Sequence, residues 1–334
     1  MMQRLRWTAP PGGSTVQGMK RRLLFAAGAA TASALMWSTG ARAFAAPGPV
    51  DLETFAGAVA EARQHLEASR LNDLAAAMPG LLDMAQATMD AASGADRSAA
   101  AGLTSRLLTV AGHVAYRTSD ELAAGNLAAE ARRLAEEATD AVATAEAERV
   151  AAVVVRRSGG PAATGLMVAA ADRLEHATGL IAPAAVSAWA ETLSSAAYTA
   201  AGFGALDDAD ELLRTAQARL EAAENSAGFT VNDVGVFAMS AAMNADVYDL
   251  VLERAERVDP DLLATGHQRA HFHKDLAIAT AVCGEHNRAV REMERIQVLS
   301  PDFLAYRPWA RTLARDLADT TPGAQSMVVQ RLAR

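Results

Sequence analysis

The chain has 334 residues, of which 51% are hydrophobic and 5% aromatic, and its formal net charge is −8. A single cysteine, Cys283, excludes a disulfide-stabilised scaffold and any site with several thiolate ligands. The acidic balance argues against a chain that binds polyanions as a whole. Alanine, the best helix former, supplies 81 residues, whereas β-branched and aromatic strand formers are sparse. Composition therefore predicts a mostly helical protein of one long or two medium domains.

Residues 1–50 form a basic leader with six basic and no acidic residues, whereas the rest of the chain carries 25 basic and 39 acidic residues. Within the leader, Lys20-Arg21-Arg22 precedes an uncharged apolar stretch, Leu23–Trp37, and the small-x-small sequence Ala41-Arg42-Ala43 follows. This order is typical of a signal peptide, and the arginine pair is similar to a twin-arginine signal. The stretch is too short to cross a hydrocarbon core of about 30 Å comfortably, so no stable membrane span is predicted. Because an alanine-rich linker or first helix also explains the leader, we predict a cytoplasmic protein, with export as the alternative.

From Asp51 onward, apolar residues recur with helical spacing in thirteen segments. These segments are Leu52–Ser69, Leu71–Ala91, Leu103–Arg117, Leu122–Val142, Ala145–Arg157, Thr164–His176, Ala184–Ala201, Ala205–Ala223, Val231–Asn244, Asp246–Val258, His267–Val282, Asn287–Leu299 and Pro308–Leu317. The breakers between them are Pro79-Gly80, Ser158-Gly159-Gly160-Pro161, Gly202–Gly204, Asp259-Pro260, Cys283-Gly284 and Ser300-Pro301. No segment alternates with a period of two for long enough to predict a strand. Many short helices with short connections predict an all-α fold, either an α-solenoid or a helical bundle.

Two stretches align as copies of one helix–turn–helix unit when Gly204 is matched with Gly284. Five residues after each glycine lies an alanine, Ala209 or Ala289, and the second unit closes with Pro301. The other matched positions are Ala196-Ala197 with Leu276-Ala277, and Ala216 with Ile296. Glycine permits a tight turn, small residues let the two helices approach closely, and proline ends the second helix. The unit of about 34 residues resembles the tetratricopeptide repeat and favours an α-solenoid of antiparallel helix pairs.

A third, partial unit spans Val231–Pro260 and carries Asn244-Ala245-Asp246 where the turn glycine would stand. Gly125 and Gly160 are candidates for two further turns. We therefore divide the chain into the leader at 1–50, a tetratricopeptide-like helical repeat domain at 51–320 and a C-terminal tail at 321–334.

The part of the chain from about residue 228 to residue 317 is similar to a known family. The matching elements are Arg254–Pro260, Gln268–Ala277, Gly284, Ala289-Val290, Leu299-Ser300-Pro301 and Arg307-Pro308. Together they resemble the C-terminal tetratricopeptide region of actinobacterial helix-turn-helix regulators of the Xre type. The resemblance implies a sensing or oligomerising role, in which the chain binds a peptide, a protein or a small ligand or associates with itself.

In that family the repeat region follows a DNA-binding head, and Arg4–Pro11 is similar to the linker after such a head. Only 22 residues precede the apolar stretch, however, and none of them forms a recognition helix with spaced side chains for base edges. DNA binding by this chain is therefore not expected.

Solenoid repeats present a concave groove lined by the first helix of each pair, which suits a peptide or a partner helix. Trp189 and Tyr198 belong to one unit, and Phe237 opens the next. Such aromatic side chains can line the groove or form core wedges between repeats. Together with His271 and His273 from the resembling region, they are the candidate groove residues.

Enzymatic motifs are missing from the sequence. His267 and His271 are four residues apart, as zinc ligands on one helix face often are, with His273 and Cys283 nearby. We predict no metal site, because there is no HExxH, no CxxC and no carboxylate at ligand spacing. There is also no Walker A sequence, no G-x-S-x-G and no complete dinucleotide-binding loop. The sequence therefore predicts a non-enzymatic interaction or ligand-sensing module without a cofactor, with an exported helical scaffold as the alternative.

Overall fold

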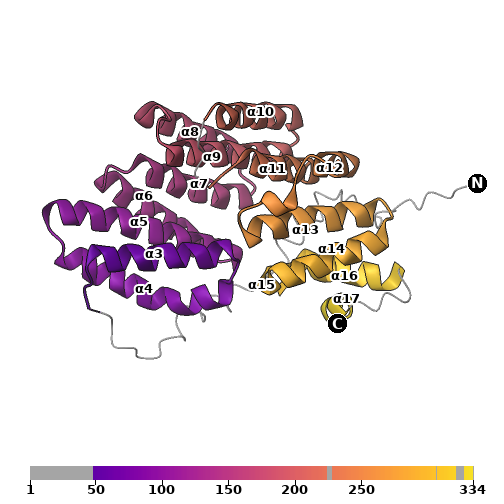
Figure 1. Ribbon diagram of the computed structural model, residues 1–334, viewed down its shortest axis with the longest axis horizontal. Helices are drawn as coiled ribbons and strands as arrows, with labels where there is room; N and C mark the ends of the chain where they lie inside the picture. Colours follow the sequence, from indigo (N-terminus) through magenta and orange to yellow (C-terminus); the bar gives the residue numbers. More distant parts are fainter. Residues whose placement is uncertain (1–47, 224–227, 306, 321–326, 334) are drawn as a thin grey trace, which may run out of the picture.

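The computed structural model describes residues 48–223, 228–305, 307–320 and 327–333. These residues form fifteen α-helices and one short 3-10 helix, with no strand among them (Figure 1). The helices are α3 (Leu52–Glu67), α4 (Leu71–Ala91), α5 (Gly94–Arg117), α6 (Glu121–Glu137), α7 (Ala141–Arg157), α8 (Ala163–Thr178), α9 (Pro183–Gly202), α10 (Leu206–Ala222), α11 (Val231–Asn244), α12 (Tyr248–Ala255), η1 (Pro260–Leu262), α13 (Gly266–Val282), α14 (His286–Leu299), α15 (Pro301–Ala305), α16 (Pro308–Thr320) and α17 (Met327–Ala333). The predicted all-α class is confirmed. The signal-like segment of the leader lies outside the described residues.

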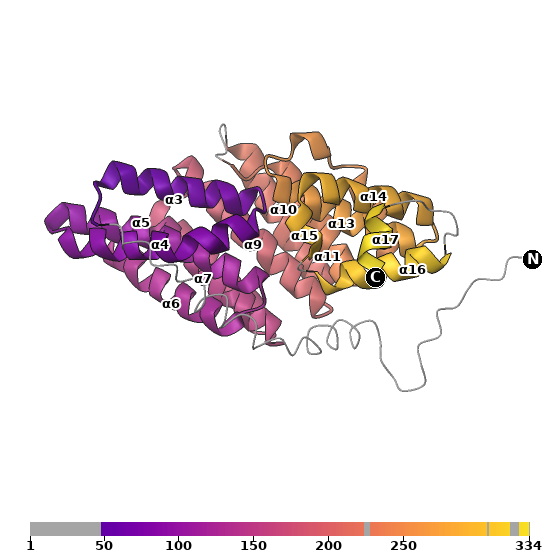
Figure 2. The same ribbon diagram turned by 90° about the horizontal axis from the view of Figure 1, so that it is seen from below.

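The helices stack in two layers, as Figures 1 and 2 show. The inner layer consists of α3, α5, α7, α9, α11 and α13, each of which contacts the next one in this series. The outer helices α4, α6, α8, α10 and α12 each contact the inner helix before them and the inner helix after them. A hairpin of two helices cannot bury its apolar face alone, so neighbouring hairpins complete one another's cores. This arrangement confirms a solenoid-like stack of helix pairs.

The turn inside a helix pair has the backbone geometry expected at Gly204. This residue has φ of +90°, its N–H donates to the carbonyl oxygen of Ala201 at 3.0 Å, and the N–H of Ala205 donates to Ala200 at 3.0 Å. Two such bonds around a left-handed residue close the end of a helix and reverse the chain. Gly284, with φ of +85°, makes the corresponding turn between α13 and α14. Both predicted glycine turns are confirmed.

The other helix pairs make the same turn, often without glycine. The left-handed residues in these turns are Ser69, Ser119, Gly159 and Asp246. Asp246 confirms the turn expected in the partial third unit. The α7–α8 turn also occurs where Gly160 predicted it, although its neighbour Gly159 is the left-handed residue. The motif therefore recurs through the stack even where the residue type does not mark it.

One expected breaker and one candidate turn are wrong. Pro79-Gly80 lies inside α4, and Gly125 lies inside α6. In α4 the buried Met78 and Ala85 lie on either side of the breaker. Burial of this face on both sides outweighs the missing proline N–H, which costs about 3 kcal/mol in a helix interior. Gly125 costs only about 1 kcal/mol relative to alanine, which is too little to end a packed helix.

The matched small residues of the two repeat units pack as predicted. Ala209 and Ala289 are completely buried, and both lie in the cores formed with the preceding inner helix. Fully buried residues also include Ala197, Ala277, Ala216 and Ile296. Helix α14 ends at Leu299 and the short helix α15 begins at Pro301, in line with the predicted role of this proline. Because alanine adds so little side chain, these helices can lie close together.

The two ends of the described chain contact each other. Helix α3 touches α13, and the Ser69 hydroxyl lies 2.9 Å from Nδ1 of His267. The Asn72 side-chain amide donates to the carboxylate of Asp302 at 2.9 Å, and its backbone N–H donates to the same group at 3.2 Å. In Figure 1 the indigo α3 accordingly meets the orange α13 near the middle of the molecule. The stack therefore curves until its first helix pair reaches its last.

Helix α17 lies in the segment that the sequence assigns to a C-terminal tail. Its Val329 is buried, and the helix contacts α14 and α16. These residues thus belong to the last part of the core. Among the described residues, no helix combines the length and the apolar character that a membrane crossing requires.

Candidate functional site

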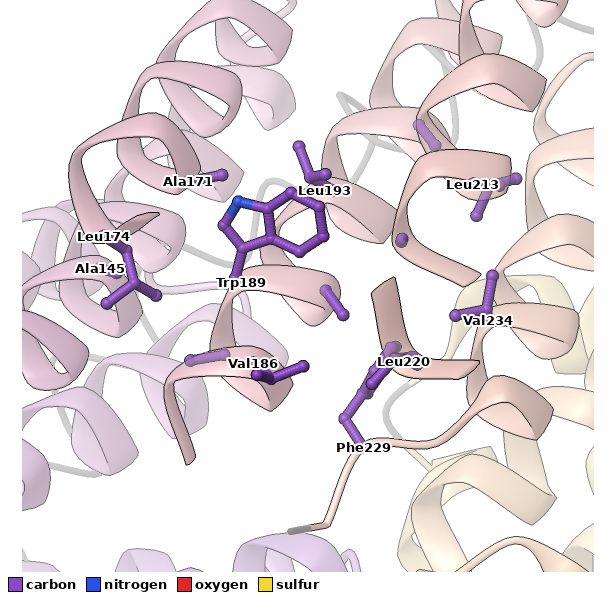
Figure 3. Close-up of a cluster of buried hydrophobic side chains, with 14 of the residues drawn as sticks. Ala145, Ala171, Leu174, Val186, Trp189, Leu193, Leu213, Leu220, Phe229 and Val234 are labelled. Atoms are coloured by element: carbon purple, nitrogen blue, oxygen red, sulfur yellow. The ribbon is translucent and has the colours of Figure 1, made fainter. Parts of the chain in front are cut away.

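The predicted groove residues lie in different environments, and Trp189 and Phe237 belong to the core. Trp189 is 6% exposed and lies beside Leu193 and Leu174 (Figure 3). Phe237 is half-buried against the same core, and its ring centroid is 5.9 Å from that of Phe229. Of the two interpretations of these aromatic residues, Trp189 fits a core wedge between repeats and not a groove residue.

His273 is also buried, between α13 and α14. Its Nδ1 lies 2.6 Å from Oε2 of Glu292. The other carboxylate oxygen of Glu292, Oε1, accepts a hydrogen bond from Arg295 at 3.0 Å. Burial of Glu292 acts to raise its pKa, but His273 and Arg295 outweigh that effect and lower it. This polar pair joins the two helices of the last repeat unit.

Tyr198 and His271 project from the inner layer. The guanidinium carbon of Arg156 lies 4.8 Å from the centre of the Tyr198 ring. The His271 ring makes edge contacts with His267 at 4.5 Å and with Phe303 at 5.0 Å. The two histidines on one helix face thus pack with an aromatic ring beside the contact between the chain ends. No group of three or more His, Cys, Asp or Glu side chains in the described parts of the chain is arranged to hold a metal ion.

A cationic site lies where three inner helices end near the closing contact. Helix α5 ends with Tyr116 and Arg117, and α7 ends with Arg156 and Arg157. Arg307, between α15 and α16, adds a charge that acts on both Tyr116 and Arg117. We call these five residues the central arginine cluster. All five side chains are half-buried.

Hydrogen bonds to helix ends hold the cluster in place. Arg117 donates to the carbonyl oxygen of Leu66 at the end of α3 at 3.1 Å, and Arg157 donates to that of Tyr116 at the end of α5 at 2.7 Å. The last carbonyls of a helix have no partner within it and carry partial negative charge, so arginine is a favourable partner there. These bonds tie α5 to α3 and α7 to α5.

Arg156 donates hydrogen bonds to uncharged groups. One of its guanidinium nitrogens donates to the Tyr116 hydroxyl at 3.1 Å, and the other donates to the Thr199 hydroxyl at 3.3 Å. Arg307 lies over the Phe303 ring, 5.2 Å from its centre. Within the described parts of the chain, neither arginine forms an ion pair with a carboxylate, and neither does Arg117. Arg157, by contrast, lies 3.6 Å from Glu121.

The excess of positive charge perturbs the groups inside the cluster. Burial, together with the charge of Arg307, lowers the pKa of Arg117 to about 9. Burial acts to raise the pKa of Tyr116, but Arg156 and Arg157 outweigh it and lower this pKa to about 8. The lowered pKa of Tyr116 indicates a positive potential from the arginines around its hydroxyl.

Sequence reasoning did not find this cluster. It treated Tyr116-Arg117 and Arg156-Arg157 only as ends of predicted helices. The available signal was the pair of large polar residues that ends both α5 and α7, with Tyr198 one turn before the end of α9. Arg307 carried no such signal, because only the curvature of the whole stack brings it to Tyr116.

Comparison with known proteins adds no assignment to this geometry. No family model matches the chain, and no curated protein matches it.

Proposed function

We propose that this chain is a non-enzymatic interaction and ligand-sensing module of the tetratricopeptide type, in the lineage of Xre-type regulators. The observation that carries the proposal is the group of half-buried polar side chains near the ends of inner helices α5, α7 and α9, where Arg156 contacts both Tyr116 and Tyr198. Solenoids use their inner face for binding because successive helices add side chains to one continuous surface. A peptide, a protein segment or a small ligand would contact these residues.

The closing contacts supply the means of sensing. They consist of a few polar bonds at Ser69 and Asn72, each worth about 1 kcal/mol. A ligand that binds the closed stack better than an opened one would shift the equilibrium between them by its difference in affinity. The same shift could alter self-association or the recruitment of a partner.

A matched pair of aromatic truncations tests the inner face. The full chain is screened for peptides and metabolites that raise its urea midpoint, and hits are mapped by hydrogen exchange. Tyr198→Ala, on the inner face of α9, should abolish the stabilisation. Phe203→Ala, at the exposed end of the same helix, should leave it unchanged. Protection confined to the outer helices, or equal binding by Tyr198→Ala, would contradict the proposal.

A further inference from the structure

A hollow of about 350 Å³ opens between the outer helices α4 and α6, over the inner helix α5. Leu82 comes from α4, Leu108 from α5 and Leu127 from α6, so three helices contribute an apolar side chain to it. Leu82 and Leu127 stay partly exposed, although both pack against the core that contains Leu108. We call this hollow the α4–α6 groove, and its lining residues are Leu82, Leu108, Ala123, Asn126, Leu127 and Glu130.

The groove suits an apolar occupant. Four of its six lining residues are apolar, and their surface remains open to solvent within the part of the chain that the structure describes. Burial of apolar surface against a second apolar surface is favourable, because it removes both from water. The question is therefore which apolar group lies near enough to fill it.

The first described residues lie beside this groove. The backbone N–H of Val50 donates to the Thr88 hydroxyl near the end of α4, at 3.3 Å. Val50 also packs against the same core as Leu82 and Leu127. The chain that precedes Val50 therefore starts next to the walls of the α4–α6 groove.

The apolar stretch of the leader, Leu23–Trp37, is close enough in sequence to reach the groove. Trp37 is thirteen residues before Val50, and a random chain of that length spans about 20 Å. From Thr88 back to Leu82 is six residues of α4, which is only about 9 Å along a helix axis. A tether this short also holds its end at an effective concentration of about a millimolar, which favours the chain's own segment over a separate molecule.

Charge favours the same pairing. Helix α4 carries three aspartates and no basic residue, and α6 carries four glutamates and two arginines. Asp83 and Asp90 on α4 and Glu130 at the groove are exposed. The leader has six basic and no acidic residues, with Lys20-Arg21-Arg22 directly before its uncharged stretch. An apolar segment with a basic flank thus complements an apolar groove with acidic surroundings.

We propose that the apolar stretch Leu23–Trp37 docks in the α4–α6 groove of its own chain, with Trp37 and its neighbours against Leu82 and Leu127. The leader is then a retained part of the fold, and its basic flank faces the carboxylates of α4 and α6. The docking uses the gap between two outer helices, whereas the proposed function concerns side chains at the ends of inner helices. Either one can therefore fail without the other.

Fluorine NMR of the full chain labelled with 5-fluorotryptophan tests the docking through Trp37, whose signal is assigned by its loss in Trp37→Phe. In the wild type this signal should lie away from its position in the urea-unfolded chain. Ala123→Glu places a charge in the groove and should shift the signal to that unfolded position. The matched control is Ala129→Glu, on an exposed part of the same helix outside the groove, and it should leave the signal unchanged.

A second variant keeps the test valid if Ala123→Glu disturbs the fold. Leu35→Asp leaves every described core residue in place, and it should also shift the Trp37 signal to the unfolded position. Hydrogen exchange should then become faster in the segments of α4 and α6 around Leu82 and Leu127, and unchanged in α13 and α14. These two results together would assign the effect to the groove.

Three outcomes would overturn the inference. The first is a Trp37 signal at its unfolded position in the wild type, or one that neither Ala123→Glu nor Leu35→Asp moves. The second is a Trp37 signal that shifts on dilution while sedimentation velocity shows a dimer that dissociates, because the groove would then hold a segment of a second copy. The third is an intact mass that begins after Ala43, which would show that the leader is removed as a signal peptide.

Discussion

The ionisation of Tyr116 gives a quantitative test of the positive potential at the central arginine cluster. Arg156 donates a hydrogen bond to its hydroxyl at 3.1 Å, and the surrounding arginines lower its pKa to about 8. An unperturbed tyrosine has a pKa near 10, so the shift of about two units corresponds to about 2.7 kcal/mol. Between these pH values the folded protein loses a proton that the unfolded chain retains. Stability therefore rises with pH in this range, and the contribution disappears as pH falls below about 8.

The substitution Tyr116→Phe removes both the hydrogen bond and the ionisation. At pH 7 it should lower the free energy of unfolding by about 1–2 kcal/mol, because the guanidinium of Arg156 loses an acceptor. At pH 9.5 the difference in the free energy of unfolding between wild type and variant should be about 2 kcal/mol larger than at pH 7. This figure follows from the shift of about two pKa units.

Urea unfolding at the two pH values measures the difference, and ultraviolet titration of tyrosinate assigns it. The wild type should show one tyrosine that ionises near pH 8, and the variant should lack it. Tyr248 does not interfere, because burial and Asp246 raise its pKa to about 12. Identical titration curves for wild type and variant, or a stability difference that does not change with pH, would refute the positive potential at the cluster.

Three further predictions concern stability. Burial lowers the pKa of His113, His267 and His271 well below the usual value of 6.5, so at acidic pH the unfolded chain binds protons that the folded chain does not. The free energy of unfolding should therefore fall as pH drops below about 6.5, by roughly 1 kcal/mol per histidine and pH unit, and urea melts with no dependence on pH in this range would contradict this. Gly204→Ala should cost about 1–2 kcal/mol through its φ of +90° alone, since a Cβ there meets no atom within 4 Å, whereas Ser119→Gly should raise the urea midpoint slightly. A higher midpoint for Gly204→Ala, or a lower one for Ser119→Gly, would exclude a backbone origin. Ala289→Leu should destabilise the stack by about 1–3 kcal/mol because its site is completely buried, and a thermal melt like that of the wild type would show that the helices can separate there.

The helix pairs were predictable from the sequence because their determinants are local. Gly204 and Gly284 lie at turns that their neighbours define within about six residues, and Ala209 and Ala289 pack against the helix just before them. Ser119 forms the same turn with no glycine, so nothing in its residue type announces it. Pattern reasoning therefore finds the repeat where the sequence is typical and misses the turn where the fold imposes a strained residue.

The candidate site was not predictable in the same way because it depends on the curvature of the whole stack. Arg156 and Arg307 are separated by most of the C-terminal half of the chain, and each one alone is an ordinary arginine near a helix end. Their shared influence on Tyr116 appears only when the last helices come round to the first. Trp189 illustrates the opposite case, since a large aromatic residue attracts attention in a sequence but fills the core in the fold.

Closure of the stack and the central arginine cluster meet on one short helix, α15. Asp302 at its start accepts the hydrogen bonds of Asn72, and the guanidinium of Arg307 lies over the ring of Phe303. Under the proposed function, a ligand that prefers the closed stack therefore also holds α15 against α4, because Asn72 and Asp302 join these two helices. Linkage requires the effect to be reciprocal: the factor by which loss of the Asn72 contact weakens ligand binding equals the factor by which ligand strengthens that contact.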